Sequence, residues 1–373
     1  MGFRCGIVGL PNVGKSTIFN ALTSAGAASA NYPFCTIDPN FGIVAVPDPR
    51  LERIQKYIPT EKVVPVVIEF VDIAGLVKGA AQGEGLGNQF LGHIRSTDAI
   101  AHVVRCFADD DVIHVDGGVD PLRDIATIQT ELIFADNSTV EAALNRYIKQ
   151  SKAGKKAIAQ IMTMLADLHE HLQALKPAST FPAGQYFGDT LEVSAAYQAL
   201  HLITSKKVVY VCNVDEETAL SAGGDNEASR VVRELALREG AAVVCVSGKI
   251  EEELSLLPEA ERGEMLASLG LAESGLAQLI RTGYSLLGLQ TYFTAGVKEV
   301  RAWTIGAGWK APQAAGVIHS DFARGFICAE VFSIADLERA GSKTKLKELG
   351  QIRLEGKEYI VKDGDVMEFR FNV

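Results

Sequence analysis

The sequence of 373 residues lacks the features of a membrane or secreted protein. No apolar stretch approaches the length of about eighteen residues that a membrane-spanning helix needs, and no cationic segment followed by an apolar run opens the chain. The six cysteines show no C-x-x-C spacing and lie mostly in apolar runs, which favours buried thiols over disulfides. We therefore expect a soluble, cytoplasmic protein without membrane contacts.

A basic excess, an internal repeat and low-complexity tracts are also absent from the sequence. The net charge of −10 repels polyanions, so any nucleic-acid contact must come from a local patch, and we expect no DNA partner. The apolar content of 47% is enough for real cores, and the length suits two or three domains. A monomer is the expected state.

One short motif fixes the class of chemistry. The residues Gly9-Leu-Pro-Asn-Val-Gly-Lys-Ser-Thr17 fit G-x-x-x-x-G-K-[ST] and directly follow an apolar strand candidate. The two glycines let backbone N–H groups turn toward a phosphate, Lys15 adds a positive charge for binding and catalysis, and Ser16 offers a hydroxyl to Mg²⁺. The motif predicts a loop that binds a nucleoside triphosphate through Asn12, Val13, Gly14, Lys15, Ser16 and Thr17.

Strand-like runs alternate with helical patterns up to about residue 135 and again after residue 205, which predicts a doubly wound α/β sheet. The expected strands are Cys5–Gly9, Phe41–Val46, Val63–Asp72, Ala99–Phe107, Val208–Asn213 and Ala242–Ser247. The expected helices are Ser16–Thr23, Asn88–Thr97, Asp124–Asp136 and Ala228–Glu239. The fold class is that of a P-loop NTPase.

A helical arm interrupts this sheet. From the N-cap cluster Asn137-Ser-Thr to Leu175, apolar residues recur at three-to-four spacing without proline, which predicts one long helix. Pro177–Gly188 supplies a turn and Val193–Thr204 is the expected return, giving an inserted helical hairpin of coiled-coil type. Four lysines in this helix form either a solvated face or a contact to a phosphate backbone: Lys149, Lys152, Lys155 and Lys156.

After Leu289 the chain changes to short alternating segments, which predict a strand-rich C-terminal domain. These segments are Val300–Ile305, Gly325–Phe332, Gln351–Leu354, Tyr359–Val361 and Val366–Phe371. The domains are therefore residues 1–136 with 205–288, residues 137–204, and residues 289–373. Cations and aromatics mix in the last domain either as an RNA-contacting surface or as core residues at strand spacing: Lys298, Arg301, Trp303, Trp309, Lys310, Arg324 and Phe326.

A second phosphate motif follows the expected strand that ends at Asp72. Asp72 and Gly75 form D-x-x-G, which places a carboxylate near Mg²⁺ and an amide beside a γ-phosphate. Thr36 lies between the two motifs and is either a switch residue that closes over the metal or an ordinary loop threonine. Phe34, in the same loop, completes the nucleotide-binding set. Leu76 fills the place of the glutamine of many GTPases and cannot orient a water molecule.

The segment Asn213-Val-Asp-Glu216 stands where GTPases carry N-K-x-D. Val214 replaces the lysine that lies over guanine, and the carboxylate of Glu216 reaches roughly 1.5 Å further than that of an aspartate. Asn213 can still address adenine. Ser247 and Gly248 stand where G proteins have S-A, near the base. The base end of the site therefore has an impaired guanine clamp.

The segment Gly79-Ala-Ala-Gln-Gly-Glu-Gly-Leu-Gly-Asn-Gln-Phe-Leu-Gly-His-Ile-Arg95 resembles that of the Obg-like ATPases, in the Obg-related branch of the translation-factor GTPases. The resemblance extends to the C-terminal module, where Leu289-Gln-Thr-Tyr-Phe-Thr294 is similar to part of a TGS domain, an α+β fold of β-grasp type. It implies ATP over GTP, His114 as a catalytic residue, Asn12 as a ligand of K⁺ besides Mg²⁺ held by Ser16, Thr36 and Asp72, and the ribosome or its RNA as partner. A loop histidine that is only solvated is the alternative for His114.

Three functions remain open on these residues. The first is an ATPase switch with slow turnover that regulates translation or a stress response. The second is a genuine GTPase, and the third is an ATP-gated scaffold with negligible turnover. A metabolite kinase is disfavoured because no acceptor-binding domain is apparent.

Overall fold

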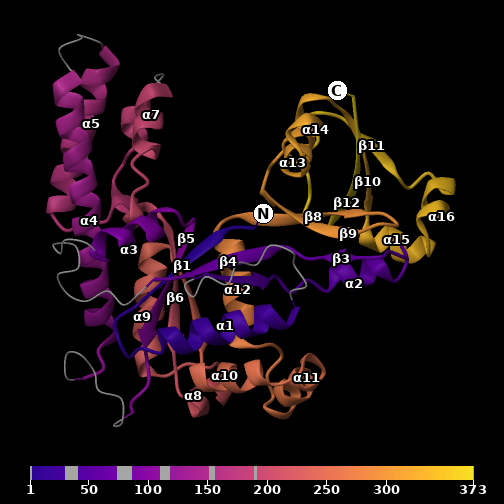
Figure 1. The fold of residues 1–373 in the computed structure, drawn as a ribbon, viewed down its shortest axis with the longest axis horizontal. Helices are drawn as coiled ribbons and strands as arrows, with labels where there is room; N and C mark the ends of the chain where they lie inside the picture. The colour runs from indigo at the N-terminus through magenta and orange to yellow at the C-terminus, as the bar shows by residue number, and fades with distance from the viewer. Residues whose placement is uncertain are drawn as a thin grey trace.

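The computed structural model describes residues 2–29, 41–73, 86–109, 118–150, 156–188 and 191–372. Its first sheet has six strands in the order β2-β4-β1-β5-β6-β7, and only β2 runs antiparallel to its neighbour (Figure 1). The strands are β1 (Arg4–Val8), β2 (Phe41–Ala45), β4 (Val67–Asp72), β5 (Ala99–Arg105), β6 (Lys207–Asn213) and β7 (Ala242–Val246). Their near-continuous apolar runs suit strands buried on both faces. The predicted doubly wound sheet is confirmed.

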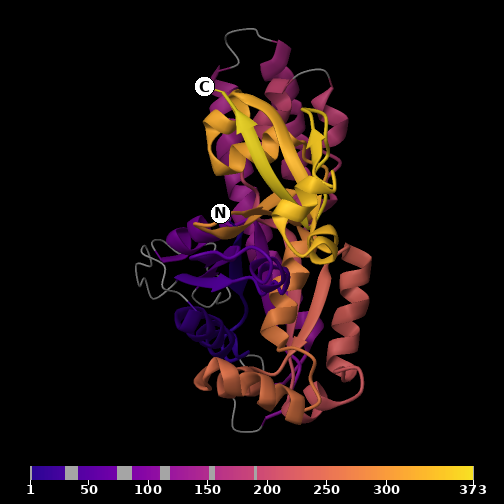
Figure 2. The ribbon, with the colours of Figure 1, turned by 90° about the vertical axis from the view of Figure 1, so that its right-hand side faces the viewer.

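Helices cover both faces of this sheet (Figure 2). Apolar side chains of α1 (Lys15–Ser29) and α12 (Gly275–Leu286) pack on one face, and those of α4 (Pro121–Gln150) and α9 (Glu227–Glu239) pack on the other. Asn226 caps α9 by accepting a hydrogen bond from the Ser229 amide, and Gly240 ends it with a positive φ of 66°. The other helices of this part are α3 (Leu86–Arg95), α8 (Glu216–Leu220), α10 (Gly248–Leu256) and α11 (Glu259–Ser268).

The arm differs from the prediction. Helix α4 runs through Asn137 without interruption, and the chain returns in α5 (Lys156–Gln173), which packs against the outer half of α4. The N-cap cluster at Asn137 and the single helix to Leu175 were therefore wrong, because Ile133 and Val140 bury one continuous apolar stripe across the expected break. Shorter elements complete the arm: η3 (Ala178–Thr180), α6 (Gly184–Phe187), α7 (Leu191–Gln198) and η4 (Ile203–Ser205).

The buried carboxylate of Asp136 fixes the base of the arm. Its two oxygens accept hydrogen bonds from the Ile203 amide at 2.8 Å, the Thr204 amide at 2.8 Å and the Thr204 hydroxyl at 2.7 Å. Burial raises the pKa of Asp136, which these hydrogen bonds and the nearby Arg95 oppose. The outgoing helix and the segment that re-enters the sheet are therefore joined at one point.

The C-terminal part forms a second sheet in the order β11-β10-β12-β8-β9-β3. Its strands are β8 (Leu289–Ala295), β9 (Val300–Gly306), β10 (Phe326–Ser333), β11 (Arg353–Glu355), β12 (Asp365–Phe371) and β3 (Val63–Val64). Four helices were not predicted: α13 (Ala311–Ile318), α14 (Ser320–Arg324), α15 (Ile334–Ala340) and α16 (Lys343–Glu348). The expected strand Tyr359–Val361 is wrong, since only an isolated bridge joins Ile360 to Lys310. The α+β class of this domain is confirmed.

The last strand of that order comes from the N-terminal part of the chain. The expected strand Val63–Asp72 is split at Pro65, which has no N–H to donate to a sheet, so β3 pairs parallel with β9 while β4 stays in the first sheet. We call residues 47–66 the connector; it also contains α2 (Arg50–Gln55).

The connector belongs to the core of the C-terminal part. Leu51 and Ile54 of α2 are buried in one cluster with Phe293 and Leu337. The Arg50 guanidinium donates to Asp363 at 2.6 Å, and Arg53 makes two hydrogen bonds of 2.8 Å to Glu338. Two parts of the chain that lie far apart in sequence thus fold as one unit, which the predicted domain boundaries did not include (Figure 1). Within the described residues, no helix is long and apolar enough to cross a membrane.

Candidate nucleotide-binding site

The phosphate loop lies between β1 and α1, as predicted. Gly14 has a φ of 88°, and a Cβ there would lie 2.1 Å from the Asn213 side-chain nitrogen, so only glycine fits. Asn12 also has a positive φ, of 63°. Helix α1 begins at Lys15, so its amino end directs N–H groups and a positive dipole toward the loop. The backbone can therefore hold an anion.

The phosphate loop lies next to Asp72, the first residue of the second predicted phosphate motif. Register pairing of Ile7 with Asp72 places the end of β4 beside the start of the phosphate loop, and the Lys15 ammonium donates a hydrogen bond to the Asp72 carboxylate. The two side chains are 9% and 18% exposed, so their charges are only weakly screened. The neighbouring Ser16 is exposed at the surface of the site. Lys15 and Asp72 thus carry the charges that a phosphate and an Mg²⁺ ion each attract.

Asn213 joins the phosphate loop to the base-binding loops. Its side-chain nitrogen donates to the Val13 carbonyl at 2.9 Å, and its side-chain oxygen accepts from the Gly248 amide at 3.0 Å. The side chain is buried, so both bonds hold the loops in place. One nitrogen-bound hydrogen remains for an adenine acceptor, because an amide has two donors.

At the base end, Val214 stands at the position of the lysine in N-K-x-D. The Val214 side chain is buried in a core cluster, which leaves its backbone as the part that can face a ligand. Asp215 caps α8 by accepting from the Thr218 amide at 2.7 Å, and the Glu216 carboxylate lies half exposed, 3.9 Å from Lys249. The Ser247 hydroxyl is buried and has no hydrogen-bond partner in the described part of the chain, so it offers a polar contact to a base.

Two residues that the sequence reasoning missed organise the end of β5. The Arg105 guanidinium is buried and donates to the carbonyls of Phe107 at 3.2 Å and Asp109 at 3.0 Å. The Asn226 side chain donates to the Cys106 carbonyl at 2.7 Å. The capping spacing of Asn226 and Ser229 was a readable signal, whereas nothing in the sequence pointed to Arg105.

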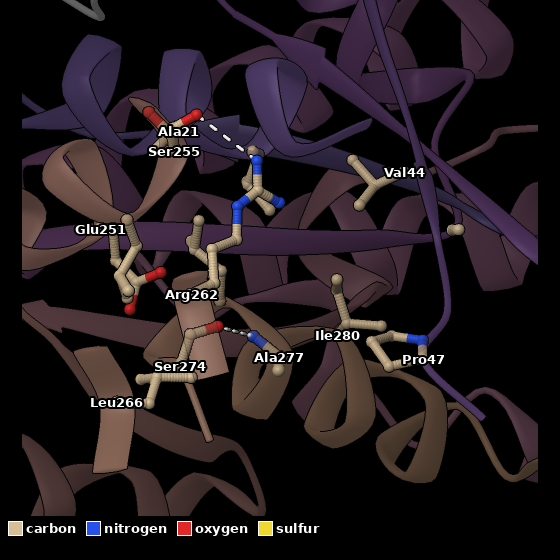
Figure 3. A pocket seen from close by; sticks show the side chains of 14 residues that line it. Ala21, Val44, Pro47, Glu251, Ser255, Arg262, Leu266, Ser274, Ala277 and Ile280 are labelled. Carbon is tan, nitrogen blue, oxygen red and sulfur yellow. Dashed lines mark hydrogen bonds between the residues drawn. The ribbon is translucent and has the colours of Figure 1, made fainter. Parts of the chain in front are cut away.

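A separate cavity of about 290 Å³ lies behind α1 (Figure 3). It is bounded by α1, β2, α10, α11 and α12, and none of the predicted site residues lines it. Glu251 lies at its edge and accepts a hydrogen bond from the Gly275 amide at 2.6 Å. Burial raises the pKa of Glu251 to about 7. This cavity is mainly apolar and is distinct from the phosphate site.

Comparison with known proteins identifies the family. A family profile described as "50S ribosome-binding GTPase" matches residues 4–146, and the YchF GTPase C-terminal profile, described as a "Protein of unknown function (DUF933)", matches residues 289–372. The "Ribosome-binding ATPase YchF" of Bacillus subtilis (strain 168) is 53% identical over the whole of both chains, and that of Escherichia coli O157:H7 is 52% identical over the same span. The chain belongs to the YchF family.

A solved structure agrees with this membership in the YchF family. The "Schizosaccharomyces pombe YchF GTPase" superposes with a TM-score of 0.83 at 37% identity, covering 99% of this chain and 98% of that one. The resemblance to the Obg-like ATPases is therefore confirmed over the full length. The printed names differ in the nucleotide, ATP for the bacterial relatives and GTP for the yeast protein.

Several predicted site residues lie outside the described residues: Phe34, Thr36, Gly75, Leu76 and His114. Within the described part of this YchF family member, no group of three or more His, Cys, Asp and Glu side chains could hold a metal ion. The Mg²⁺ of a P-loop site is held by one hydroxyl, a carboxylate and the phosphates, so such a group is not required.

Proposed function

We propose that this chain binds and hydrolyses ATP and works as a switch on the ribosome. The base end of the site carries this proposal: the Val214 side chain packs into the core where a lysine would cover guanine, and Glu216 sets its carboxylate beside Lys249. Without a lysine stem and a well-placed carboxylate, the site loses its main reason to prefer guanine. The bacterial relatives are named ribosome-binding ATPases, which agrees with this proposal.

At the phosphate end, backbone amides and side chains contact different parts of the bound Mg²⁺-nucleotide. Amides of Val13, Gly14 and Thr17 and the Lys15 ammonium bind the phosphates, while Ser16 and Asp72 fit Mg²⁺, which would neutralise phosphate charge when bound. Because Asp72 already bonds to Lys15, the metal carboxylate and the phosphate cation hold each other in position.

The remaining assignments rest on the sequence motifs and on the family resemblance. We assign Thr36 to the metal, Phe34 and Gly75 to the nucleotide, and Asn12 to K⁺ beside the phosphates. Since Leu76 cannot accept or donate a hydrogen bond, we assign the orientation of the attacking water to His114, whose ordinary pKa suits proton transfer near neutrality.

We further propose that the chain acts as a cytoplasmic monomer whose arm and C-terminal part contact the ribosome. The division into residues 1–136 with 205–288, residues 137–204 and residues 289–373 remains our domain proposal, with the connector added to the core of the last. The ribosome-binding names of the bacterial relatives support the partner.

The test measures nucleotide choice and turnover together. Calorimetric titration with ATP and GTP in Mg²⁺ and K⁺ should give tighter binding of ATP, and phosphate release should rise when purified ribosomes are added. His114→Ala should slow hydrolysis while ATP still binds. Tighter GTP binding would favour a GTPase. Intact cellular function in His114→Ala, with loss of function in Lys15→Ala, would favour the scaffold.

A further inference from the structure

Another cavity, with a mixed polar and apolar lining, lies at the base of the arm, at the end of the strands opposite to the nucleotide site. It has a volume of about 460 Å³. Lys207, the first residue of β6, lines this cavity, whereas Asn213, the last residue of β6, lies in the nucleotide site. Its walls are the sheet, α4, the end of α9 and the segments 177–180 and 203–207 that leave the arm. This volume lies in the range of small-molecule sites.

The floor of this arm-base cavity is an apolar slot with two rings. Strand register pairs Ile100 with Val208 and His102 with Tyr210, so these side chains share one face of the sheet. The two rings lie 5.6 Å apart at 41°. Ile128 of α4 lines the same cavity. A flat ligand body would therefore find both ring and aliphatic side chains in the lining.

Most polar groups around the slot already have partners. The Tyr210 hydroxyl donates to Glu239 at 2.6 Å, and the Thr204 hydroxyl donates to Asp136. The Lys206 ammonium donates to the carbonyls of Arg95, at 3.1 Å, and Thr97. These groups shape the cavity and do not need a ligand.

A second set of lining groups is left for a ligand. His102, Gln129, Ser179 and Lys207 make no hydrogen bond through their side chains within the described residues, and Arg238 makes only a long one, of 3.4 Å, to its own helix. His102 is 6% exposed and lines the floor. Burial lowers the pKa of His102 to about 4, so the neutral ring is available as a hydrogen-bond donor and acceptor.

The charged groups at the rim of the cavity favour an anionic ligand. Among the lining groups, Lys206, Lys207 and Arg238 outnumber the single carboxylate of Glu239, while Asp98 and Asp136 act on Lys206 from behind the lining. Lys207 and Arg238 are exposed, so they can meet an anionic group at the mouth.

We propose that the arm-base cavity is a binding site for a small aromatic anion, its ring system in the slot beside His102 and its anionic group between Lys207 and Arg238. Because the walls include α4 and both segments that leave the arm, a bound ligand would contact the arm and the sheet together and stabilise their relative position. This site is separate from the ATP site, and the proposal does not depend on the proposed function.

The test compares two fluorescent probes that differ in one anionic group. These are 8-anilinonaphthalene-1-sulfonate and its uncharged analogue N-phenyl-1-naphthylamine, each titrated into the full chain. The sulfonate should bind the wild type more tightly than the neutral probe. The double variant Lys207→Glu/Arg238→Glu should weaken sulfonate binding by about tenfold or more and leave the neutral probe within about twofold. Equal binding of the sulfonate to wild type and double variant would overturn the proposal.

Two tryptophan variants locate the probe. Ser179→Trp should block the arm-base cavity and abolish binding of both probes, whereas Ser255→Trp, placed in the cavity behind α1 (Figure 3), should leave both unchanged. Loss of probe binding in Ser255→Trp alone would assign the probe to the other cavity and reject the proposal.

A direct measurement keeps the proposal testable if a variant fails to fold. In wild-type protein with isotopically labelled histidine, the sulfonate should shift the ring resonance of His102 more than those of the other histidines. That resonance is assigned by its loss in His102→Asn. Probe binding without any movement of the His102 signal would contradict the proposal.

Discussion

The Lys15 ammonium donates a hydrogen bond to the Asp72 carboxylate, which links the phosphate loop to the end of β4. Both groups are largely buried, and their opposite charges compensate each other. The contact directly joins the cation that we propose binds the phosphates to the carboxylate that we propose binds the metal. Nucleotide and metal binding should therefore be coupled in this protein.

Replacing Lys15 by alanine should abolish tight ATP binding and lower hydrolysis by about a hundredfold or more, because a preorganised charge at the phosphates is lost. Calorimetry and a phosphate-release assay measure the two effects. Lys298→Ala, an exposed site in the C-terminal part, is the matched control and should behave as wild type. Wild-type affinity in Lys15→Ala would show that the phosphates bind elsewhere.

Shortening Glu216 to aspartate should raise GTP affinity relative to ATP by about tenfold, since the carboxylate moves toward the position that guanine requires. Competition between labelled ATP and unlabelled GTP gives the ratio directly. The neighbouring Glu217→Asp is the control, because that side chain is exposed. An unchanged ratio in both variants would mean that Glu216 does not face the base.

Asn213→Ala should weaken ATP and GTP binding together and lower the thermal midpoint, because the Val13 carbonyl and the Gly248 amide both lose their partner. Leaving such buried groups unsatisfied costs about 1–3 kcal/mol each. Differential scanning fluorimetry and nucleotide titration measure the two effects. Asn20→Ala, on the exposed side of α1, should change neither. An unchanged thermal midpoint with weaker ATP binding would mean that Asn213 acts on the base alone and does not hold the loops.

Glu251 should make stability depend on pH. Its pKa is raised from 4.5 to about 7 by burial, so the folded state holds its proton more tightly than the unfolded state. The free energy of unfolding should therefore fall by an amount on the order of 3 kcal/mol as pH rises from about 4.5 to 7. Above pH 7 this contribution should stay constant.

Urea unfolding of wild type and Glu251→Gln at several pH values isolates this effect. The difference between the two proteins should change through the window from pH 4.5 to 7, because glutamine keeps an acceptor for the Gly275 amide but does not titrate. Glu252→Gln, on the exposed side of the same helix, should show no such difference. Parallel curves for wild type and Glu251→Gln would refute the assignment.

Arg50→Ala should loosen the contact between the connector and the C-terminal part. Arg50 bonds to Asp48 and Asp363 and lies 5.1 Å from the centre of the Phe293 ring, so its loss removes both charge and packing. Hydrogen exchange should become faster in α2 and β3, with little change in β1. Arg324→Ala removes an exposed ion pair inside the C-terminal part and serves as the control. Unchanged exchange in α2 would mean that the apolar cluster alone holds the connector.

The first sheet and the phosphate end of the site could be read from sequence because local rules determine them. The strands around Gly9–Thr17 are apolar runs, and the loop needs glycine at Gly14 for its positive φ. The contact of Lys15 with Asp72 follows from parallel pairing, which brings strand ends to one edge. The nucleotide-end residues outside the described part of the chain stay predictions.

Long-range packing explains what the sequence did not reveal. Asn137 has the chemistry of an N-cap, but the apolar stripe of α4 continues across it and tertiary burial decides. Val63 and Val67 read as one strand, although Pro65 divides them between two sheets. The role of Arg105 could not be predicted, because no local sequence pattern distinguishes a buried arginine from an exposed one.

The connector has a consequence for synthesis of the protein. Thr60 meets its partner Val297 only after 237 further residues have been made, which takes roughly 12–50 s at about 5–20 residues per second. Until then, Phe293 and Leu337 cannot cover the apolar side of α2 on the nascent chain. Slow loop closure should therefore limit the last stage of folding, and a fragment released before Val300 should be a target for chaperones.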